Sequence, residues 1–362
     1  MKSTKMEEKM IPAREPPVNS RGVLGWMREK LFATPLQSLM TLTIIYGLYL
    51  ILPPFWQWAV MDATWTGESR SACNVDGACW AFVTARLDQF IYGFYPESEI
   101  WRVNLFFAQL ALILGWLMIP AIPGKKLALG VGLLVLPVTS WLVLSGGYFG
   151  LPEVETHKWG GLMVTLVLAL YGMLASLPVG VLLALGRRSS MPVIRTFCTA
   201  YIELWRGVPL ITVLFMASVM LPLFVPEEIV FDKLVRALIG IVMFQSAYMA
   251  EVVRGGLQAI PRGQVEACQS LGMGYWQSML LVVLPQAIRL VIPGIVNTFI
   301  ALFKDTSLVL VIGLFDLLSI VQAALNDPEW LGSAVEGYLF AGFVFWLFCF
   351  GMSKYSQRLE KN

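Results

Sequence analysis

Long apolar segments alternate with short polar ones along this chain of 362 residues. A helix needs about 20 apolar residues to cross the hydrocarbon core of a bilayer. The apolar segments lie at about 36–58, 103–121, 127–145, 161–185, 207–225, 234–253, 286–315 and 335–352. The pattern therefore predicts an all-α polytopic membrane protein with about eight transmembrane helices.

Composition supports this class and excludes several others. Only 14% of the residues are charged and 57% are hydrophobic, whereas soluble domains carry about 25% charged residues. A net charge of +2 gives no basic field for nucleic acid. The single histidine, His157, and five cysteines without a CxxC pair argue against a metal site. An intramembrane enzyme would also need a nucleophile with a base, or metal ligands, and the pattern offers neither.

The chain is expected to have three parts. Residues 1–35 form a basic tail, whose end can lie on the membrane as an amphipathic helix or be disordered. Residues 36–158 hold three spans and a polar loop at 60–100, and residues 159–355 hold five spans. With the N-terminus inside, most of the 26 lysines and arginines lie on inner segments, as the positive-inside rule requires. Both termini, and the polar insert at 254–285, are then cytoplasmic.

Two cysteines lie in the outer loop at 60–100. Cys73 and Cys79 can form a small disulfide loop if that side of the membrane is an oxidising compartment. The alternative is two free thiols.

The polar insert between the sixth and seventh spans has the features of a helical hairpin. Residues 262–271 suit a short helix with Ala267 and Leu271 on one face. Gly272 follows, where a helix stop favours a residue without a side chain, and residues 275–284 suit a second helix. Such a hairpin can dock a partner outside the membrane, and the alternative is a loop that only lies at the interface. No phosphate-binding loop occurs in the sequence, so ATP would have to be used by another chain.

Charges near the ends of spans form two further candidates. Glu251 and Arg254 lie at i and i+3 of the sixth span, as an exposed interfacial pair or as a gate or coupling contact. Arg187 and Arg188, after the fourth span, are expected to be plain topology anchors.

Polar residues interrupt the seventh span at Lys304, Asp305, Thr306 and Ser307. Each charge costs about 3 kcal/mol or more at mid-membrane unless it faces protein or water. We therefore hypothesise that these four residues and Asn297 line a translocation path. A structural salt bridge or a snorkelling interfacial pair is the alternative.

The insert also resembles the cytoplasmic loop of membrane permeases of ATP-binding-cassette (ABC) importers. That loop reads EAA, three residues, Gly, nine residues, Ile-x-Leu-Pro. This chain has Glu266-Ala267-Cys268, Gly272, Val282 and Leu284-Pro285 at this spacing, with Cys268 and Val282 as departures. Segments 201–210, 248–256 and 304–308 look like those of polar amino-acid permeases of the histidine/glutamine type. The resemblance covers about 160–355, and the extra N-terminal third looks like a general L-amino-acid importer permease of proteobacteria.

The resemblance implies a type I importer permease fold and a function. The chain would be the permease subunit of an ABC importer that translocates L-amino acids across the bacterial inner membrane. Glu266, Ala267, Leu271 and Gly272 would form the coupling helix that docks on a separate ATPase dimer. ATP would be bound by that partner, and the permease itself would need no cofactor. A second permease subunit and a periplasmic amino-acid-binding protein would complete the system. The alternative is an ion-gradient-driven secondary amino-acid transporter.

Overall fold

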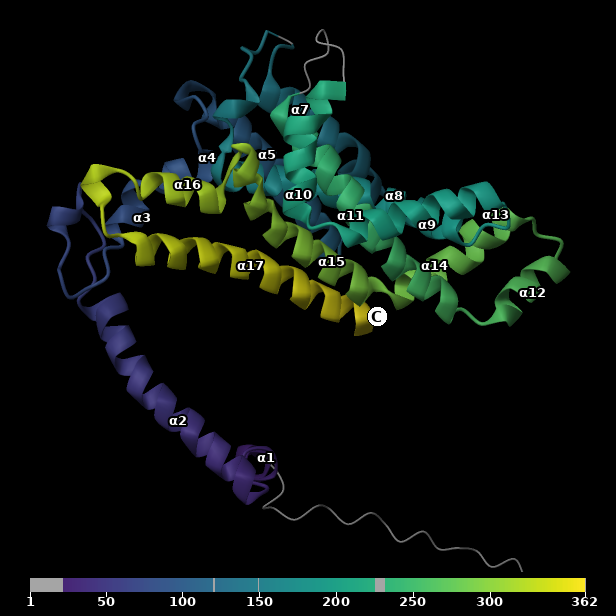
Figure 1. The fold of residues 1–362 in the computed structure, drawn as a ribbon. Helices are drawn as coiled ribbons and strands as arrows, with labels where there is room; N and C mark the ends of the chain where they lie inside the picture. The colour runs from purple at the N-terminus through teal and green to yellow at the C-terminus, as the bar shows by residue number, and fades with distance from the viewer. Residues whose placement is uncertain (1–21, 120, 149, 225–231, 362) are drawn as a thin grey trace, which may run out of the picture. The chain divides into compact units, whose positions relative to one another are not determined.

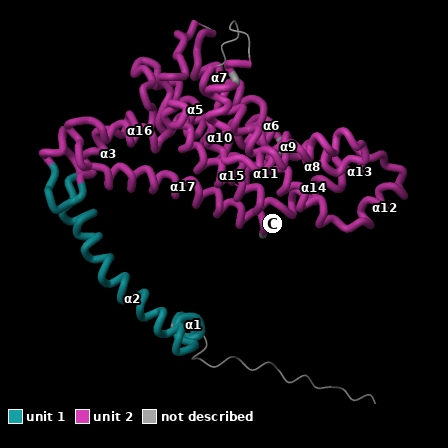
Figure 2. The backbone as a smooth tube through the Cα atoms, viewed as in Figure 1, with its two compact units in different colours: residues 1–64, 73–78 teal, residues 65–72, 79–362 magenta. Residues whose placement is uncertain are grey.

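The computed structural model describes residues 22–119, 121–148, 150–224 and 232–361. The chain divides into two compact units, residues 1–64 with 73–78 and residues 65–72 with 79–362 (Figure 2). Most of the described residues are helical, which confirms the all-α class. Residues 1–21 of the expected tail lie outside the described part of the chain.

The first unit contains the first expected span. Helix α1 (Gly22–Lys30) is followed by α2 (Pro35–Trp56), which a π turn prolongs over Gln57–Met61. The hydroxyl of Thr34 accepts a hydrogen bond from the Gln37 N–H at 3.2 Å and caps α2. None of the residues of α2 is buried within the chain. A helix that is apolar on all sides needs lipid or another protein around it.

The second unit contains every other described element. Its α-helices and its strand are α3 (Ala81–Ala85), α4 (Leu87–Tyr92), α5 (Ile100–Met118), α6 (Lys125–Gly130), α7 (Leu136–Ser145), α8 (Gly161–Arg187), α9 (Pro192–Gly207), α10 (Leu210–Phe215), α11 (Lys233–Ala259), α12 (Arg262–Ser270), α13 (Tyr275–Ser278), α14 (Leu284–Leu290), α15 (Ile292–Asp305), β1 (Phe315–Asp316), α16 (Leu317–Ala324) and α17 (Ala334–Lys361). Figure 1 shows α12 and α13 at one end of this unit, and α17 running alongside α15.

Helices α8 and α11 form the centre of the second unit. They pack along one another and contribute to two successive hydrophobic clusters. One cluster holds Val164, Leu168 and Ile241, and the other holds Ala184, Met249 and further residues of α9 and α14. The helices approach closely because glycine leaves room, as in many membrane helix pairs. A Cβ on Gly180 would lie 2.6 Å from the Met249 Cβ.

Helices α5 and α7 are part of this same core. Val103, Phe106, Leu136 and Leu144 belong to the cluster that contains the first half of α8. The boundary expected near residue 158 therefore does not coincide with the division of the structure. Of the three spans expected in residues 36–158, only the first lies in the other unit.

Seven described helices are long and apolar enough to cross a membrane, or up to eight if one bent pair counts as a span. The bent pair lies where we expected a polar segment followed by a span over 207–225. Helix α9 and the helical segment Leu210–Met220 meet at 104°. The polar segment that we expected before this span is itself a helix of 16 residues, because its polar residues all lie on one side of it.

The seventh span also differs from its expected course. A break at Val291 separates α14 from α15, and the candidate span is Ile292–Ile312. The helix is not broken at the charged residues. The α-helix passes directly into a 3-10 helix at Thr306 (Thr306–Ile312). Lys304 and Asp305 thus end the α-helical part of a continuous helical segment.

The expected loop at 60–100 is in part a packed structure. Phe82 of α3 and Phe90 of α4 are fully buried and contact Trp330 and Phe340 respectively. Cys73 and Cys79 are disulfide-bonded, whereas Cys198, Cys268 and Cys349 are free thiols.

Candidate functional site

Helix α12 ends in a turn that requires a left-handed residue. Gly272 has φ +73°, a conformation that costs other residues about 1–2 kcal/mol. The Gly272 N–H donates to the Gln269 carbonyl at 2.9 Å, and the Met273 N–H donates to the Cys268 carbonyl at 3.0 Å. These two bonds form a Schellman motif, which satisfies the last carbonyl groups of the helix. The helix stop predicted at Gly272 is confirmed.

Every residue of α12 except Cys268 is exposed. Glu266 and Ala267 are exposed, and the Leu271 side chain is 80% exposed. Cys268 is instead buried, with 3% of its surface exposed. Helix α12 contacts the π turn at Met279–Val283.

The hairpin is held in place by few contacts. The Gln286 side-chain amide donates to the Gln264 side-chain oxygen at 3.3 Å, which joins α14 to α12. The second helix starts at Tyr275 as predicted, but it does not end at Leu284. A π turn at Met279–Val283 leads into α14, so the helix continues to Leu290. Pro285 lacks an N–H and follows this π turn.

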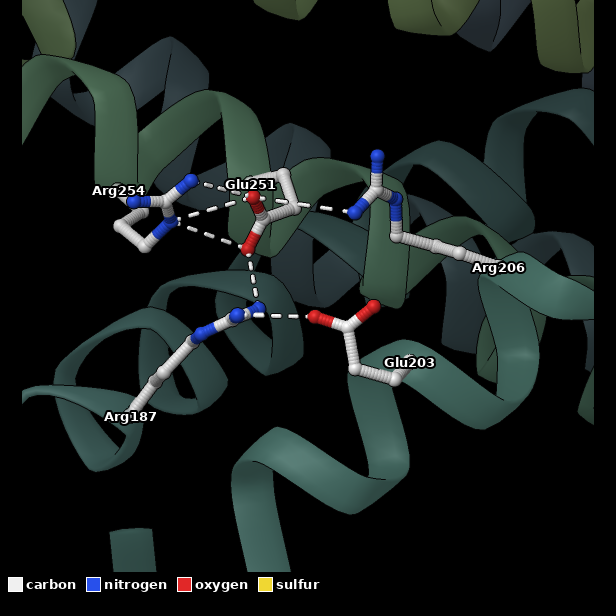
Figure 3. Close-up of polar contacts among 5 residues, drawn as sticks. All are labelled: Arg187, Glu203, Arg206, Glu251 and Arg254. Carbon is white, nitrogen blue, oxygen red and sulfur yellow. Dashed lines mark hydrogen bonds and ion pairs between the residues drawn. The ribbon is translucent and has the colours of Figure 1, made fainter. Parts of the chain in front are cut away.

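A cluster of five charged residues, which we call the arginine–glutamate cluster, lies where α8, α9 and α11 meet (Figure 3). At its centre the Glu251 carboxylate accepts hydrogen bonds from Arg254 at 2.7 Å and from Arg187 at 2.7 Å. Arg187 also donates to Glu203 at 2.8 Å, and Arg206 lies 3.8 Å from Glu251. Only 16% of the Glu251 side chain is exposed. Glu251 and Arg254 are therefore not the isolated exposed pair that was one alternative.

Arg187 is more than the topology anchor that we expected. It connects α8 to both α9 and α11 through its two hydrogen-bonded carboxylates. Its neighbour Arg188 donates to the Leu257 carbonyl at 3.0 Å. The cluster thus fixes the end of α11 from which α12 follows after Pro261.

The residues expected along a translocation path fall into two groups. Asn297 and Lys304 are exposed, seven residues apart on one helix face, and the exposed Ala301 lies between them on that face. Asp305 and Ser307 are half-buried nearby on the chain. Thr306 is fully buried, and its hydroxyl donates to the Phe303 carbonyl at 2.8 Å. Thr306 therefore does not belong to the exposed face.

No group of three His, Cys, Asp or Glu side chains able to hold a metal ion occurs among the described residues. What the described residues do present is a bundle of apolar helices with an exposed helical hairpin at one end. These features are those of a polytopic membrane protein.

Comparison with known proteins identifies the class. Residues 176–361 match the family described as the binding-protein-dependent transport system inner membrane component, and the chain belongs to this family. It is 52% identical, over 97% of this chain and 96% of the relative, to the inner membrane amino-acid ABC transporter permease protein YhdY of Escherichia coli.

Two further relatives differ in how much of the chain they match. The glutamate/glutamine/aspartate/asparagine transport system permease protein BztC of Rhodobacter capsulatus is 35% identical over 98% of this chain and 96% of the relative. The glutamate/aspartate import permease protein GltK of Escherichia coli is 36% identical over 56% of this chain and 91% of the relative. Nothing in these matches supports the ion-gradient-driven alternative.

Proposed function

We propose that this chain is a permease subunit of an ABC importer for L-amino acids, and that α12 is the helix on which the separate ATPase docks. The observation that carries the proposal is the exposed face of α12, on which Glu266, Ala267 and Leu271 are all exposed. Family membership and the names of the full-length relatives support it. The chain itself performs no covalent chemistry and needs no cofactor, because ATP is bound by the partner.

The proposal includes the rest of the assembly and its orientation. A second permease subunit, an ATPase dimer and a periplasmic amino-acid-binding protein would complete the importer. Both termini and α12 face the cytoplasm, since this orientation places most basic residues inside. ATP binding closes the ATPase dimer, and α12 transmits that movement to α11 and, through the arginine–glutamate cluster, to α8 and α9.

The exposed face of α15 is the proposed contribution of this chain to the translocation path. Lys304 can attract the carboxylate of an amino acid, and Asn297 can accept from or donate to its polar groups. Asp305 and Ser307 lie where the α-helix changes to a 3-10 helix. Charged residues at this depth are stable when they face water or protein, which a path shared with the second permease would supply.

Reconstituted transport tests the function. The importer is purified through a tag on this chain together with its ATPase and placed in proteoliposomes with ATP at the cytoplasmic face. We expect uptake of labelled L-amino acids that requires ATP and the binding protein, and that an ionophore leaves intact. Uptake that continues without ATP and stops with the ionophore would contradict the proposal.

The Glu266→Arg variant tests the docking role separately. It reverses a charge on the exposed face of α12, so we expect the permease to remain in the membrane while the ATPase no longer copurifies. The matched control is Arg358→Gln, which alters an exposed charge near the end of α17. Normal copurification of the ATPase with Glu266→Arg would remove α12 from the interface.

A further inference from the structure

A cationic cavity lies beside the arginine–glutamate cluster. It has a volume of about 750 Å³, and its lining includes Arg187, Arg188, Arg195 and Arg254 together with Thr199. The first two arginines follow the apolar span of α8 directly. This position puts the cavity at the depth of the lipid headgroups.

The positive charge of the cavity is only partly compensated. Arg187 and Arg254 both donate to Glu251. Arg188 bonds to the backbone carbonyl of Leu257, which carries no charge. The Arg195 guanidinium pairs with none of the side chains in the described ranges. Two arginines are thus available for an anion, and arginine binds phosphate oxygens in a bidentate geometry.

An apolar cavity shares a wall with the cationic one. It has a volume of about 470 Å³ and is lined by Leu182, Leu185, Met191, Ile194 and Trp276, with Arg188 common to both cavities. Ile194 and Arg195 are neighbours on α9, and each lines one of the two cavities. The two cavities together suit a molecule with an anionic end and an apolar end.

Helix α9 also presents a face that suits the bilayer. Its residues Val193, Phe197 and Leu204 are 81%, 66% and 61% exposed, and their spacing places them along one side of the helix. An amphipathic helix of this kind lies in the membrane interface with its apolar face toward the acyl chains.

We propose that the paired cavities bind one anionic phospholipid, with its phosphate between Arg188 and Arg195 and an acyl chain against Ile194 and Trp276. Basic pockets between transmembrane helices on the cytoplasmic side bind anionic headgroups for the same physical reason. Trp276 belongs to α13, so the bound lipid would touch the hairpin that carries α12. The lipid would thereby stabilise the position of the hairpin against α8 and α9.

Lipid binding to the full chain tests this site without any transport assay. Delipidated protein is titrated with phosphatidylglycerol or phosphatidylcholine and observed by native mass spectrometry. We expect selective binding of phosphatidylglycerol, weakened about 30-fold by Arg188→Gln with Arg195→Gln, from the contribution of each basic side chain near an anionic lipid. Arg358→Gln is the control, because it removes an exposed arginine away from both cavities.

Two further measurements keep the test decisive. If the double variant does not give a monodisperse protein, Arg195→Gln alone serves, since Arg195 is exposed, and we expect about 5-fold weaker binding. Ile194→Gln should weaken phosphatidylglycerol binding while it leaves the charge of the cavity intact.

Three outcomes would overturn the proposal. Unchanged phosphatidylglycerol binding by the arginine variants would remove the site. Inorganic phosphate that binds as tightly, with the same dependence on Arg195, would make it a site for free anions. Displacement of the lipid by the purified ATPase would assign the arginines to a protein interface.

Discussion

Glu251→Gln tests whether the arginine–glutamate cluster holds α8, α9 and α11 together. The substitution keeps the size of the side chain and one oxygen acceptor, but it removes the negative charge that faces Arg187, Arg206 and Arg254 (Figure 3). Within the cluster, only Arg187 then keeps a carboxylate partner, that of Glu203. The repulsion that remains opposes the packing of the three helices.

The burial of the paired side chains sets how much Glu251→Gln destabilises the protein. Removing one partner of a fully buried ion pair costs about 3–5 kcal/mol, whereas an exposed pair contributes about 0–1 kcal/mol. The Glu251 side chain is 16% exposed, and those of Arg187 and Arg254 are 22% and 31% exposed. We therefore expect Glu251→Gln to lower the free energy of unfolding by about 2 kcal/mol, between these two limits.

Glu203→Gln is the matched control, because it changes the same atoms and also faces Arg187. The Glu203 side chain is 57% exposed and makes one ion pair, at 2.8 Å. We therefore expect Glu203→Gln to lower the free energy of unfolding by only about 0–1 kcal/mol. Thermal unfolding of the two purified variants in one detergent gives the comparison. Equal melting temperatures for Glu251→Gln and Glu203→Gln would refute the assignment of Glu251 as the centre of the cluster.

Three further predictions concern the turn, the helix packing and the path. Gly272→Ala should destabilise the end of α12 by about 1–2 kcal/mol through the left-handed backbone alone, since no atom lies within 4 Å of the added Cβ. A pull-down should show weaker ATPase binding by this variant, and unchanged binding would contradict the prediction. Gly180→Ala should lower the melting temperature, because overpacking costs about 1–3 kcal/mol, whereas Gly255→Ala meets open space and should not. Asp305→Asn should reduce amino-acid uptake at least about 10-fold, as expected for one lost hydrogen bond to a charged group. Unchanged uptake with an unchanged substrate range would show that Asp305 does not line the translocation path.

Local signals in the sequence predicted the hairpin well. A Schellman motif depends on a few consecutive residues, so Gly272 and the helix before it could be recognised from spacing alone. The pair Glu251–Arg254 was visible for the same reason, at i and i+3. Most spans were also predictable, because a run of about 20 apolar residues has few other uses.

Features that depend on distant residues were missed. Arg187 meets Glu251 across 64 positions of the chain, and no local spacing reveals such a contact. Helix α9 was assigned to a polar connector, because Arg195, Glu203 and Arg206 lower its average hydropathy although its other face is apolar. The burial of Thr306 depends on how the 3-10 segment packs, which its neighbours in sequence do not determine.

Helix α11 can transmit a movement of the hairpin as a tilt about its other end. It is a single helix of 27 residues, about 40 Å long at 1.5 Å per residue, and it contains no proline. Its first turn is capped by Asp232, whose carboxylate also bonds to the Thr156 hydroxyl. A tilt of about 3° around that anchored end displaces the other end by about 2 Å, by the geometry of a rod of this length. A displacement of about 2 Å at the hairpin end therefore shifts the groups along α11 in proportion to their distance from Asp232, while the capped end stays in place.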